Sequence, residues 1–384
     1  MQYNYLASTR SLYIHWPFCP YKCHFCPFVA IASHDQFMER YHKALCTEIE
    51  RFADQSDQKL QIDTIFLGGG TPSTYPDNLL LDMLSILRNR FDIMPSCEVT
   101  IEVNPGTVVK EQFAVWQKGG ITRLSIGVQS LKDSVLKKLN RHQSAADVAY
   151  VINNAKDVFE NVSIDLILGL PDVSHEEWKE LLHAVVTWPI KHLSVYFLTV
   201  HEDTPLYFKV KTNKVTLPCD DSLIDLYTWS VNFLAEHGFN RYEISNFSRP
   251  GYESQHNTVY WERKPYKAFG LGACSFDGSA RFQNEKSLMK YMEEIEGGRQ
   301  VTIFSEVLTR KQTYLERVML GIRRPNGVLM RELMDDLSVD EKERIQEQIV
   351  WLKTNGFVSE DNDRLILTSV GLSVENTIAL QLSL

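Results

Sequence analysis

Hydrophobic residues in the first 200 positions gather in short apolar runs, separated by longer stretches in which apolar and polar residues alternate with helical spacing. Short runs rich in Val, Ile, Leu and Phe are typical of buried strands. We predict six such strands, at residues 11–16, 62–69, 97–104, 121–128, 161–168 and 191–198. Apolar residues at i, i+3 and i+4 predict helices between them, the clearest at residues 35–53, 76–91 and 174–188.

The helix starts carry the expected polar residues. Ser174 precedes Glu176 and Glu177, and Asp77 stands at the start of its helical pattern. Six strands that alternate with helices indicate an α/β fold with a parallel sheet. Their regular spacing favours a TIM-like barrel, here a partial (β/α)6 barrel.

The pattern changes after residue 245, where loop-forming and aromatic residues become frequent. We therefore predict a core at residues 1–245, a loop-rich segment at residues 246–300 and a C-terminal module at residues 301–384. In the last of these, a helical pattern at 340–356 is followed by a turn and a short strand pair, which resembles an α+β winged-helix module. Such modules bind DNA in some proteins.

Charge and composition narrow the choice of partners. The net charge of the chain is −9, which gives no electrostatic support for nucleic-acid binding and favours a packing role for the module. The first 16 residues lack the features of a signal peptide, and the longest apolar runs are far shorter than a membrane span. We expect a cytoplasmic protein without a membrane span, and leave peripheral membrane contact open.

Cysteine usage points to chemistry rather than to disulfides. The chain has seven cysteines, an odd number, and Cys19, Cys23 and Cys26 form a C-x3-C-x2-C cluster just after the first predicted strand. A structural zinc site and an ordinary iron–sulfur cube each require four ligands. Either His15 or His24 completes a zinc site, or one metal position is left open. The cluster alone leaves both explanations standing.

Further polar residues and glycines stand at the ends of the following strands. In a β/α barrel the carboxyl ends of the strands meet at one mouth, where ligands bind. The residues in these positions are Gly68, Gly69, Gly70, Glu102, Asn104, Gln129 and Asp165. Each could serve a turn or a structural hydrogen bond, but together they favour a ligand site.

Taken together, several motifs resemble a known family. They are YIHWPFC (13–19), GGGTPS (68–73), IEVNP (101–105), RLSIGVQS (123–130), LNRHQS (139–144), IDLILGLP (164–171) and QHNTVYW (255–261). The chain resembles the radical S-adenosylmethionine (SAM) superfamily over nearly its whole length. Within it, the chain is similar to the branch of oxygen-independent coproporphyrinogen III dehydrogenase and its HemW-type heme-chaperone relatives.

This resemblance implies a [4Fe–4S] cluster on Cys19, Cys23 and Cys26, with the open position on the fourth iron taken by SAM. By the same resemblance, Tyr13 and Phe25 border the cluster and SAM. The remaining implied contacts to SAM, or to a second SAM, are Gly69, Gly70, Thr71, Glu102, Gln129, Arg141 and Asp165. Glu102 would accept the SAM ammonium. Two of these assignments have structural alternatives: Asp165 as an interior hydrogen-bond anchor and Arg141 as a solvated cation at a helix end.

Three local features separate the two kinds of relative. The dehydrogenase type has a further cysteine two residues after the third, where this chain has Phe28. Many HemW-type chains have Asp after the third cysteine, where this chain has Pro27. QHNTVYW matches the H-N-x-x-Y-W signature of the HemW type. The balance favours a heme chaperone that delivers heme to an apoprotein. A coproporphyrinogen III dehydrogenase, or another radical SAM enzyme acting on a porphyrin, is the alternative.

His256 is the predicted heme ligand. Imidazole is a common axial ligand of heme iron, and Tyr252, Tyr260 and Tyr266 stand nearby in the sequence to flank a macrocycle. The alternative is that His256 pins its loop by hydrogen bonds. We also expect His142 to lie on the surface and Cys274 to be a buried small residue.

Overall fold

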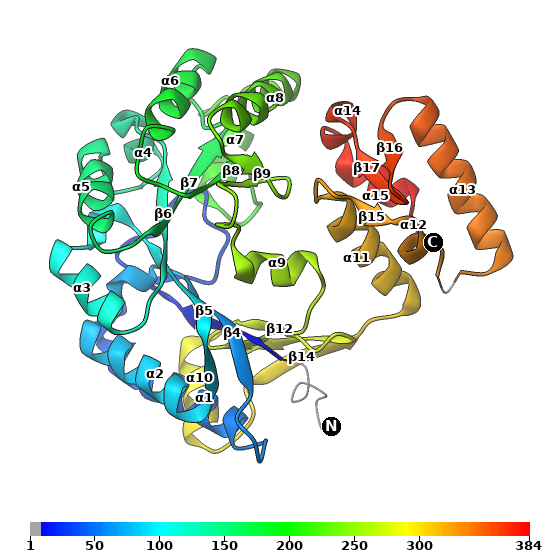
Figure 1. The fold of residues 1–384 in the computed structure, drawn as a ribbon. Helices are drawn as coiled ribbons and strands as arrows, with labels where there is room; N and C mark the ends of the chain where they lie inside the picture. Colours follow the sequence, from blue (N-terminus) through cyan, green and yellow to red (C-terminus); the bar gives the residue numbers. More distant parts are fainter. Residues whose placement is uncertain (1–8, 336) are drawn as a thin grey trace.

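The computed structural model describes residues 9–335 and 337–384 (Figure 1). A nine-stranded sheet lies at its centre, in the order β11-β1-β4-β5-β6-β7-β8-β10-β9. Its six central strands run parallel and confirm the predicted ones: β1 (Ser11–Trp16), β4 (Gln61–Gly69), β5 (Asp92–Val103), β6 (Arg123–Gln129), β7 (Asn161–Leu168) and β8 (His192–Phe197). The strand order ends at β11 and β9 without closing, so the fold is the predicted partial (β/α)6 barrel.

Helices cover the outer face of these strands (Figure 1). They are α1 (Met38–Ala53), α2 (Asp77–Arg90), α3 (Lys110–Lys118), α5 (Ala145–Ala155), α6 (His175–Val185) and α8 (Asp220–Glu236). Two short helices, α4 (Asp133–Lys138) and α7 (Pro205–Lys211), pack instead with Phe25 of the cysteine loop in a separate apolar cluster. Ser174 caps α6 as predicted, because its side chain accepts a hydrogen bond from the Glu177 N–H. Asp77 is the first residue of α2 and Pro76 takes the cap position, where no side-chain hydrogen bond forms.

The segment at residues 246–300 is part of the barrel, which corrects the predicted domain division. β10 (Asn246–Ser248) pairs antiparallel with β8 and with β9 (Asn240–Arg241) at one edge of the sheet. β11 (Lys267–Phe269) pairs parallel with β1 at the other edge. Strands of two or three residues have too few positions to show an alternating pattern, which is why the sequence indicated only a loop.

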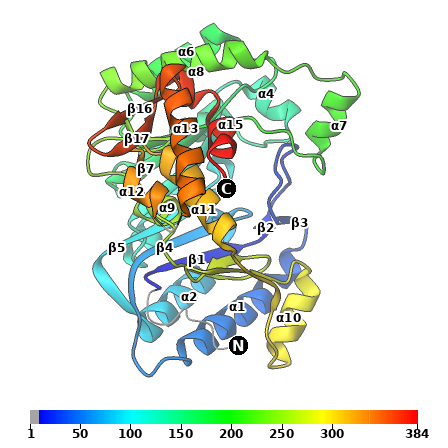
Figure 2. The same ribbon diagram turned by 90° about the vertical axis from the view of Figure 1, so that its right-hand side faces the viewer.

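A buried carboxylate ties the rest of this segment to α1. Glu48 accepts hydrogen bonds from the Gly270 N–H at 2.8 Å, from Asn284 Nδ2 at 2.8 Å and from the Tyr291 hydroxyl at 2.7 Å. Tyr291 lies in α10 (Leu288–Glu296), which packs beside α1 (Figure 2). One apolar core runs from Leu12 to Val301. The boundary after residue 300 therefore falls too early.

The C-terminal module has its own apolar core, from Tyr314 to Leu382. A second sheet, β12 (Cys274–Phe276), β13 (Ala280–Asn284) and β14 (Thr302–Val307), precedes it. The module contains α11 (Arg310–Ile322), β15 (Val328–Leu329), α12 (Met330–Met334), α13 (Val339–Thr354), β16 (Val358–Asp361), β17 (Arg364–Leu367), α14 (Ser369–Leu372) and α15 (Glu375–Gln381). Helix, strand, two helices and a strand pair follow one another as in a winged-helix module.

Ion pairs join the module to the barrel. Glu316 of α11 is 3.0 Å from Arg263 Nε and 2.9 Å from Arg281 Nη2. The first of these arginines follows α9 (Gln255–Trp261), which lies between the barrel strands and α11 (Figure 1). The two cores therefore meet across a charged, partly buried contact.

The module's longest helix is not basic. α13 carries four acidic and three basic residues, a net charge of −1, which gives no support for a DNA-binding helix. Among the described residues, no helix has both the length and the apolar character needed to cross a bilayer.

Candidate functional site

A cavity of about 410 Å³ lies at the carboxyl ends of the parallel strands. Its volume is within the usual range for small-molecule sites. Eleven of the predicted site residues line it: Cys19, Cys23, Phe25, Cys26, Gly69, Gly70, Thr71, Glu102, Gln129, Arg141 and Asp165. The structure thus brings together residues that span nearly 150 positions of the chain. Tyr13 and His256 do not line the cavity.

The three thiols project from a loop that leaves β1. Cys19 ends β2 (Phe18–Cys19), a short strand paired with β3 (Ile31–Ala32). The loop is anchored to the turn after α4, where the His24 N–H donates to the Leu139 carbonyl at 2.9 Å. Asn140 Nδ2 also donates to the Lys22 carbonyl at 2.9 Å. These bonds hold the thiols against the cavity wall.

Burial disfavours the thiolate form of Cys19 and Cys26. It raises the pKa of Cys19 to about 11 and also raises the pKa of Cys26. The Thr71 hydroxyl donates to the Cys19 sulfur at 3.1 Å, and Arg141 Nη1 lies 3.7 Å from the Cys23 sulfur. The hydrogen bond from Thr71 favours the thiolate of Cys19. Metal binding would displace the remaining protons, as it does at thiolate sites in general.

The geometry contradicts a zinc site completed by histidine. His15 uses both ring nitrogens elsewhere, on the Tyr13 hydroxyl at 3.1 Å and on the Val29 carbonyl at 2.8 Å. His24 Nδ1 contacts the Lys138 carbonyl at 3.1 Å. Within the described part of the chain, the three loop thiols do not form a group whose ligand atoms all lie within 4.8 Å of one another. They are spread too widely for one ion, as ligands of a multi-iron cluster are.

The glycine turn after β4 serves packing as well as ligand access. Gly69 has φ +118°, and a Cβ there would lie 2.6 Å from the His15 ring. A Cβ on Gly70 would lie 2.5 Å from the Pro17 carbonyl oxygen. Only glycine lets this turn approach the start of the cysteine loop. The Gly69 N–H donates to Glu102 Oε2 at 3.1 Å, so the turn also positions the carboxylate.

Two carboxyl groups face the same cavity. Burial and the nearby Asp165 raise the pKa of Glu102 to about 8. Burial also raises the pKa of Asp165, opposed by hydrogen bonds from Ser194 and Ser125 and by the charge of Arg123. Ser125 Oγ donates to Asp165 Oδ2 at 3.1 Å. Asp165 is therefore a hydrogen-bonded interior group and a cavity residue at once.

Arg141 points into the cavity and not into solvent. This contradicts the alternative that it is a solvated cation at a helix end. Its Nη2 donates to the Gly127 carbonyl at 2.9 Å and its Nε to Gln143 Oε1 at 2.8 Å. Gln129, with φ 65°, ends β6 at an irregularity in the pairing with β7. His142, next to Arg141, is exposed as predicted.

The donor set fits an iron–sulfur cluster and SAM. Three thiols on one wall leave one iron of a cube without a protein ligand. The Glu102 carboxylate suits an ammonium, and Arg141 suits a carboxylate. Asn104 Oδ1 is buried and has no described hydrogen-bond partner, while its Nδ2 donates to the Tyr21 hydroxyl at 2.8 Å. An acceptor of this kind facing a cavity suits a hydroxyl or amino group of a ligand.

Comparisons with known proteins agree with this geometry. The model of the radical SAM superfamily matches residues 13–185, and that of the HemN C-terminal domain matches residues 308–374. The heme chaperone HemW of Lactococcus lactis is 30% identical over 374 residues, 97% of each chain. HemW of Synechocystis is 33% identical over 377 residues, 94% of this chain and 90% of the relative.

The chain belongs to the HemW family of radical SAM proteins. Its fold is also similar to that of the radical SAM enzyme coproporphyrinogen III oxidase (HemN) of Escherichia coli. The TM-score is 0.84 at 24% identity, over 99% of this chain and 91% of the HemN chain. The radical SAM family implies a [4Fe–4S] cluster and SAM, and the match to the HemN C-terminal domain begins at residue 308, just after β14.

One predicted contact, His256, needs correction within this HemW-family fold, whereas the role of Tyr13 beside SAM stays a prediction, since burial and the nearby Glu102 raise the pKa of Tyr13. Tyr13 lies inside the barrel, where its ring stacks on Phe66 with centroids 6.2 Å apart and its hydroxyl meets His15. His256 is 0% exposed. Its Nδ1 meets Thr64 Oγ1 at 2.8 Å, and its Nε2 meets the Tyr260 hydroxyl at 2.8 Å.

With both nitrogens occupied and no exposed surface, His256 pins α9 to β4, so this arrangement contradicts axial ligation of heme. The QHNTVYW stretch is helix α9 and not a loop. Cys274 is exposed, which is the reverse of the expectation, because its strand β12 lies at the edge of the second sheet.

The sequence interpretation also missed residues of the cavity. Tyr196, Phe197, Leu198, Thr199 and His201 line it from the end of β8. The rule that selected the earlier strand ends applies equally to the sixth strand, so these positions were open to prediction. Phe197 and Leu198 are apolar and give no polar signal at the strand end, but Thr199 and His201 are polar and follow the sixth predicted strand.

The buried Glu102 predicts a dependence of stability on pH. In the folded chain its pKa is about 8, against an ordinary value of 4.5, so the folded state binds more protons between these pH values. Stability therefore falls as pH rises. We expect the free energy of unfolding of the cluster-free chain to fall, relative to Glu102→Gln, by about 1.4 kcal/mol per pH unit between about pH 5 and 8. Denaturant titrations at several pH values measure this. A difference that does not change with pH would contradict it.

Proposed function

We propose that this chain is a heme chaperone that carries a [4Fe–4S] cluster, binds SAM and delivers heme to an apoprotein. Relatives named heme chaperone HemW, which match this chain over nearly its whole length, are the observation that carries the proposal. Phe28 supports it, because the dehydrogenase type has a cysteine at that position. All seven cysteines are free thiols, which suits a reducing compartment such as the cytoplasm.

In this proposal the cavity divides into a cluster wall and a SAM floor. Cys19, Cys23 and Cys26 hold the cluster, which supplies an iron with an open position and one-electron chemistry. Glu102 holds the SAM ammonium, and the glycine turn keeps that carboxylate in place through the Gly69 N–H. Arg141, Gln129 and Asp165 offer contacts to the carboxylate and hydroxyl groups of SAM.

The cluster assignment makes a first prediction. The Cys23→Ala chain, reconstituted without oxygen, should lose the cluster, whereas wild type should contain about four irons and four sulfides. Cys219→Ala, an exposed thiol outside the cavity, is the control and should keep the full iron content. Iron and sulfide assays give the answer. Equal iron loss in the two variants would refute the assignment.

The SAM assignment makes a second prediction. Glu102→Gln should weaken SAM binding to the cluster-loaded protein by on the order of 1.5–3 kcal/mol, the usual scale of a charge-assisted hydrogen bond. Glu111→Gln, on the exposed face of α3, is the control and should bind as wild type does. Calorimetry measures both affinities. Unchanged affinity in Glu102→Gln would remove this residue from the SAM site.

We infer that heme binds at the apolar rim of the same cavity. Phe28 is 65% exposed, Tyr196 41% and Phe197 40%, and all three line the cavity. Exposed aromatic side chains gathered at one opening mark a binding surface for an apolar partner. His201 is exposed at the same rim, and within the described residues no side chain hydrogen-bonds to its ring. A free imidazole beside an aromatic surface suits a heme iron.

Heme titration tests whether His201 is the axial ligand. We expect His201→Ala to shift the heme absorption spectrum and to weaken binding by about tenfold, about 1.4 kcal/mol, with the iron content of the cluster unchanged. His175→Ala, an exposed histidine at the start of α6, is the control and should bind as wild type does. An unchanged spectrum in His201→Ala would place the ligand elsewhere.

The enzyme alternative is tested in the same preparation. Wild type with its cluster, SAM and a reductant should leave coproporphyrinogen III unchanged, and should pass bound heme to an apo-hemoprotein. Mass spectrometry of the porphyrins and the Soret band of the acceptor measure the two outcomes. Conversion to protoporphyrinogen IX would overturn the chaperone proposal.

A further inference from the structure

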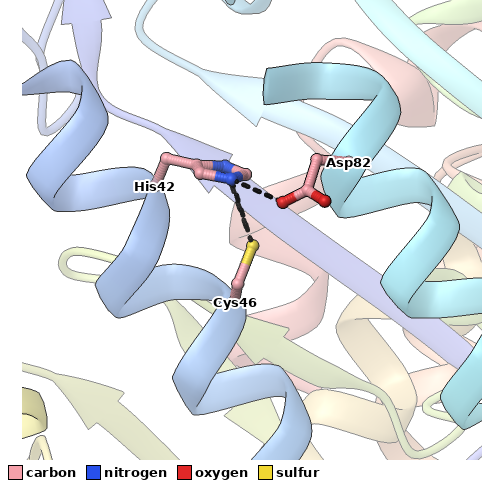
Figure 3. A group of neighbouring side chains, drawn as sticks. All are labelled: His42, Cys46 and Asp82. Carbon is pink, nitrogen blue, oxygen red and sulfur yellow. Dashed lines mark hydrogen bonds and ion pairs between the residues drawn. The ribbon is translucent and has the colours of Figure 1, made fainter. Parts of the chain in front are cut away.

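A second group of metal-binding side chains lies on the outside of the barrel, between α1 and α2 (Figure 3). His42 and Cys46 project from α1 and Asp82 from α2. The first two are four residues apart, so they lie on the same face of their helix. One ligand atom from each side chain can be chosen so that all lie within 4.8 Å of one another. None of the three lines the cavity described above.

We propose that His42, Cys46 and Asp82 bind a divalent transition-metal ion, and that Zn²⁺ is the ion whose chemistry fits them best. Imidazole nitrogen, thiolate sulfur and carboxylate oxygen are the three protein ligands that zinc uses. Three protein ligands with one position left to solvent is the composition of an open zinc site. The proposal does not depend on the heme or SAM proposals.

The distances support a single ion. His42 Nε2 is 3.7 Å from the Cys46 sulfur and 2.9 Å from Asp82 Oδ2. Tetrahedral zinc with ordinary bond lengths separates such atoms by roughly 3.3–3.7 Å. The Cys46 sulfur is 3.7 Å from both ring nitrogens, so its side chain must rotate toward Nε2 as the ion binds, and the carboxylate must move outward by a few tenths of an ångström. The Asp82 side chain is 59% exposed and is free to do so.

His42 has the support that a metal ligand requires. Its other ring nitrogen, Nδ1, meets the Tyr75 hydroxyl at 2.7 Å, which fixes the ring and leaves Nε2 directed at Asp82, with the Cys46 sulfur beside the ring. Metal-bound histidines characteristically make such a second hydrogen bond. Tyr75 is itself immobile, since it is 1% exposed and its ring stacks on Trp16 with centroids 3.7 Å apart.

The site is reachable from solvent on one side only. His42 is 4% exposed and Cys46 is 6% exposed, whereas Asp82 lies at the surface. An ion therefore enters past Asp82, and its open position faces the solvent on that side. The Cys46 thiol gives its proton to solvent as the metal–sulfur bond forms. The bound ion would link α1 to α2, two neighbouring helices of the barrel.

A hydrogen-bonded cluster without metal is the competing explanation. In that case Asp82 and Tyr75 are the hydrogen-bond partners of the two ring nitrogens of His42, and Cys46 contributes only a weak contact at 3.7 Å. The two explanations differ in what they require of the sulfur. Metal binding needs the Cys46 thiolate, while the hydrogen-bonded cluster survives its removal.

Zinc binding to the cluster-loaded protein distinguishes the metal site from the hydrogen-bonded cluster. Wild type is dialysed without oxygen against buffered Zn²⁺, and zinc and iron per chain are measured by elemental mass spectrometry. We expect about one zinc per chain in wild type, and at least tenfold weaker binding in Cys46→Ser and His42→Gln. Cys97→Ser, which removes another buried thiol, is the control and should bind zinc as wild type does. Unchanged iron content shows that the cluster is not involved.

Asp82→Asn removes a metal ligand without disturbing the fold, because the residue is at the surface and the amide keeps an oxygen that accepts a hydrogen bond. We expect weakened zinc binding with the zinc-free thermal midpoint unchanged. Zinc should raise that midpoint in wild type and leave it unchanged in Cys46→Ser. No zinc bound by wild type, or equal binding by Cys46→Ser and Cys97→Ser, would overturn the proposal.

Discussion

Parallel pairing from β1 through β8 is the constraint on which the rest of this protein depends. Because the strands run in one direction, their carboxyl ends meet at a single rim. The cysteine loop after β1, the glycine turn after β4 and the polar ends of β5 and β6 therefore share one cavity. The edge strands β10 and β11 extend the same sheet and leave it open.

Burial of charge is the cost of this arrangement. Burial raises the pKa of both Glu102 and Asp165, and the nearby Asp165 raises that of Glu102 further. The nearby guanidinium of Arg141 favours ionised Asp165. A bound ammonium would relieve the carboxylates, so ligand binding and the stability of the fold are coupled through the same groups. The two buried carboxyl groups therefore destabilise the fold when the site is empty, and a bound cationic ligand offsets that cost.

The HemW-type signature in α9 shows how a family motif differs from a ligand set. His256 and Tyr260 hydrogen-bond to each other, and His256 also bonds to Thr64 of β4. Glu98 of β5 accepts the backbone N–H of His256 at 3.0 Å. The signature thus fastens α9 to the strands, next to the contact with the C-terminal module. Within the described part of the chain, no side chain hydrogen-bonds to the ring of His201, which lies at the cavity rim.

The sequence by itself determined the six parallel strands, the partial barrel, the winged-helix-like module and eleven of the residues that line the cavity. Strand periodicity, cysteine spacing and the strand-end rule are local properties of the chain, whereas Phe25, Thr71 and Arg141 were indicated only by the resemblance to the radical SAM superfamily. Tertiary structure alone decided the burial of His256, the inward position of Tyr13 and the membership of residues 246–300 in the barrel. It also decided the approach of Asp82 to His42 and Cys46. These depend on which distant segments pack together, and spacing along one chain carries no information about that.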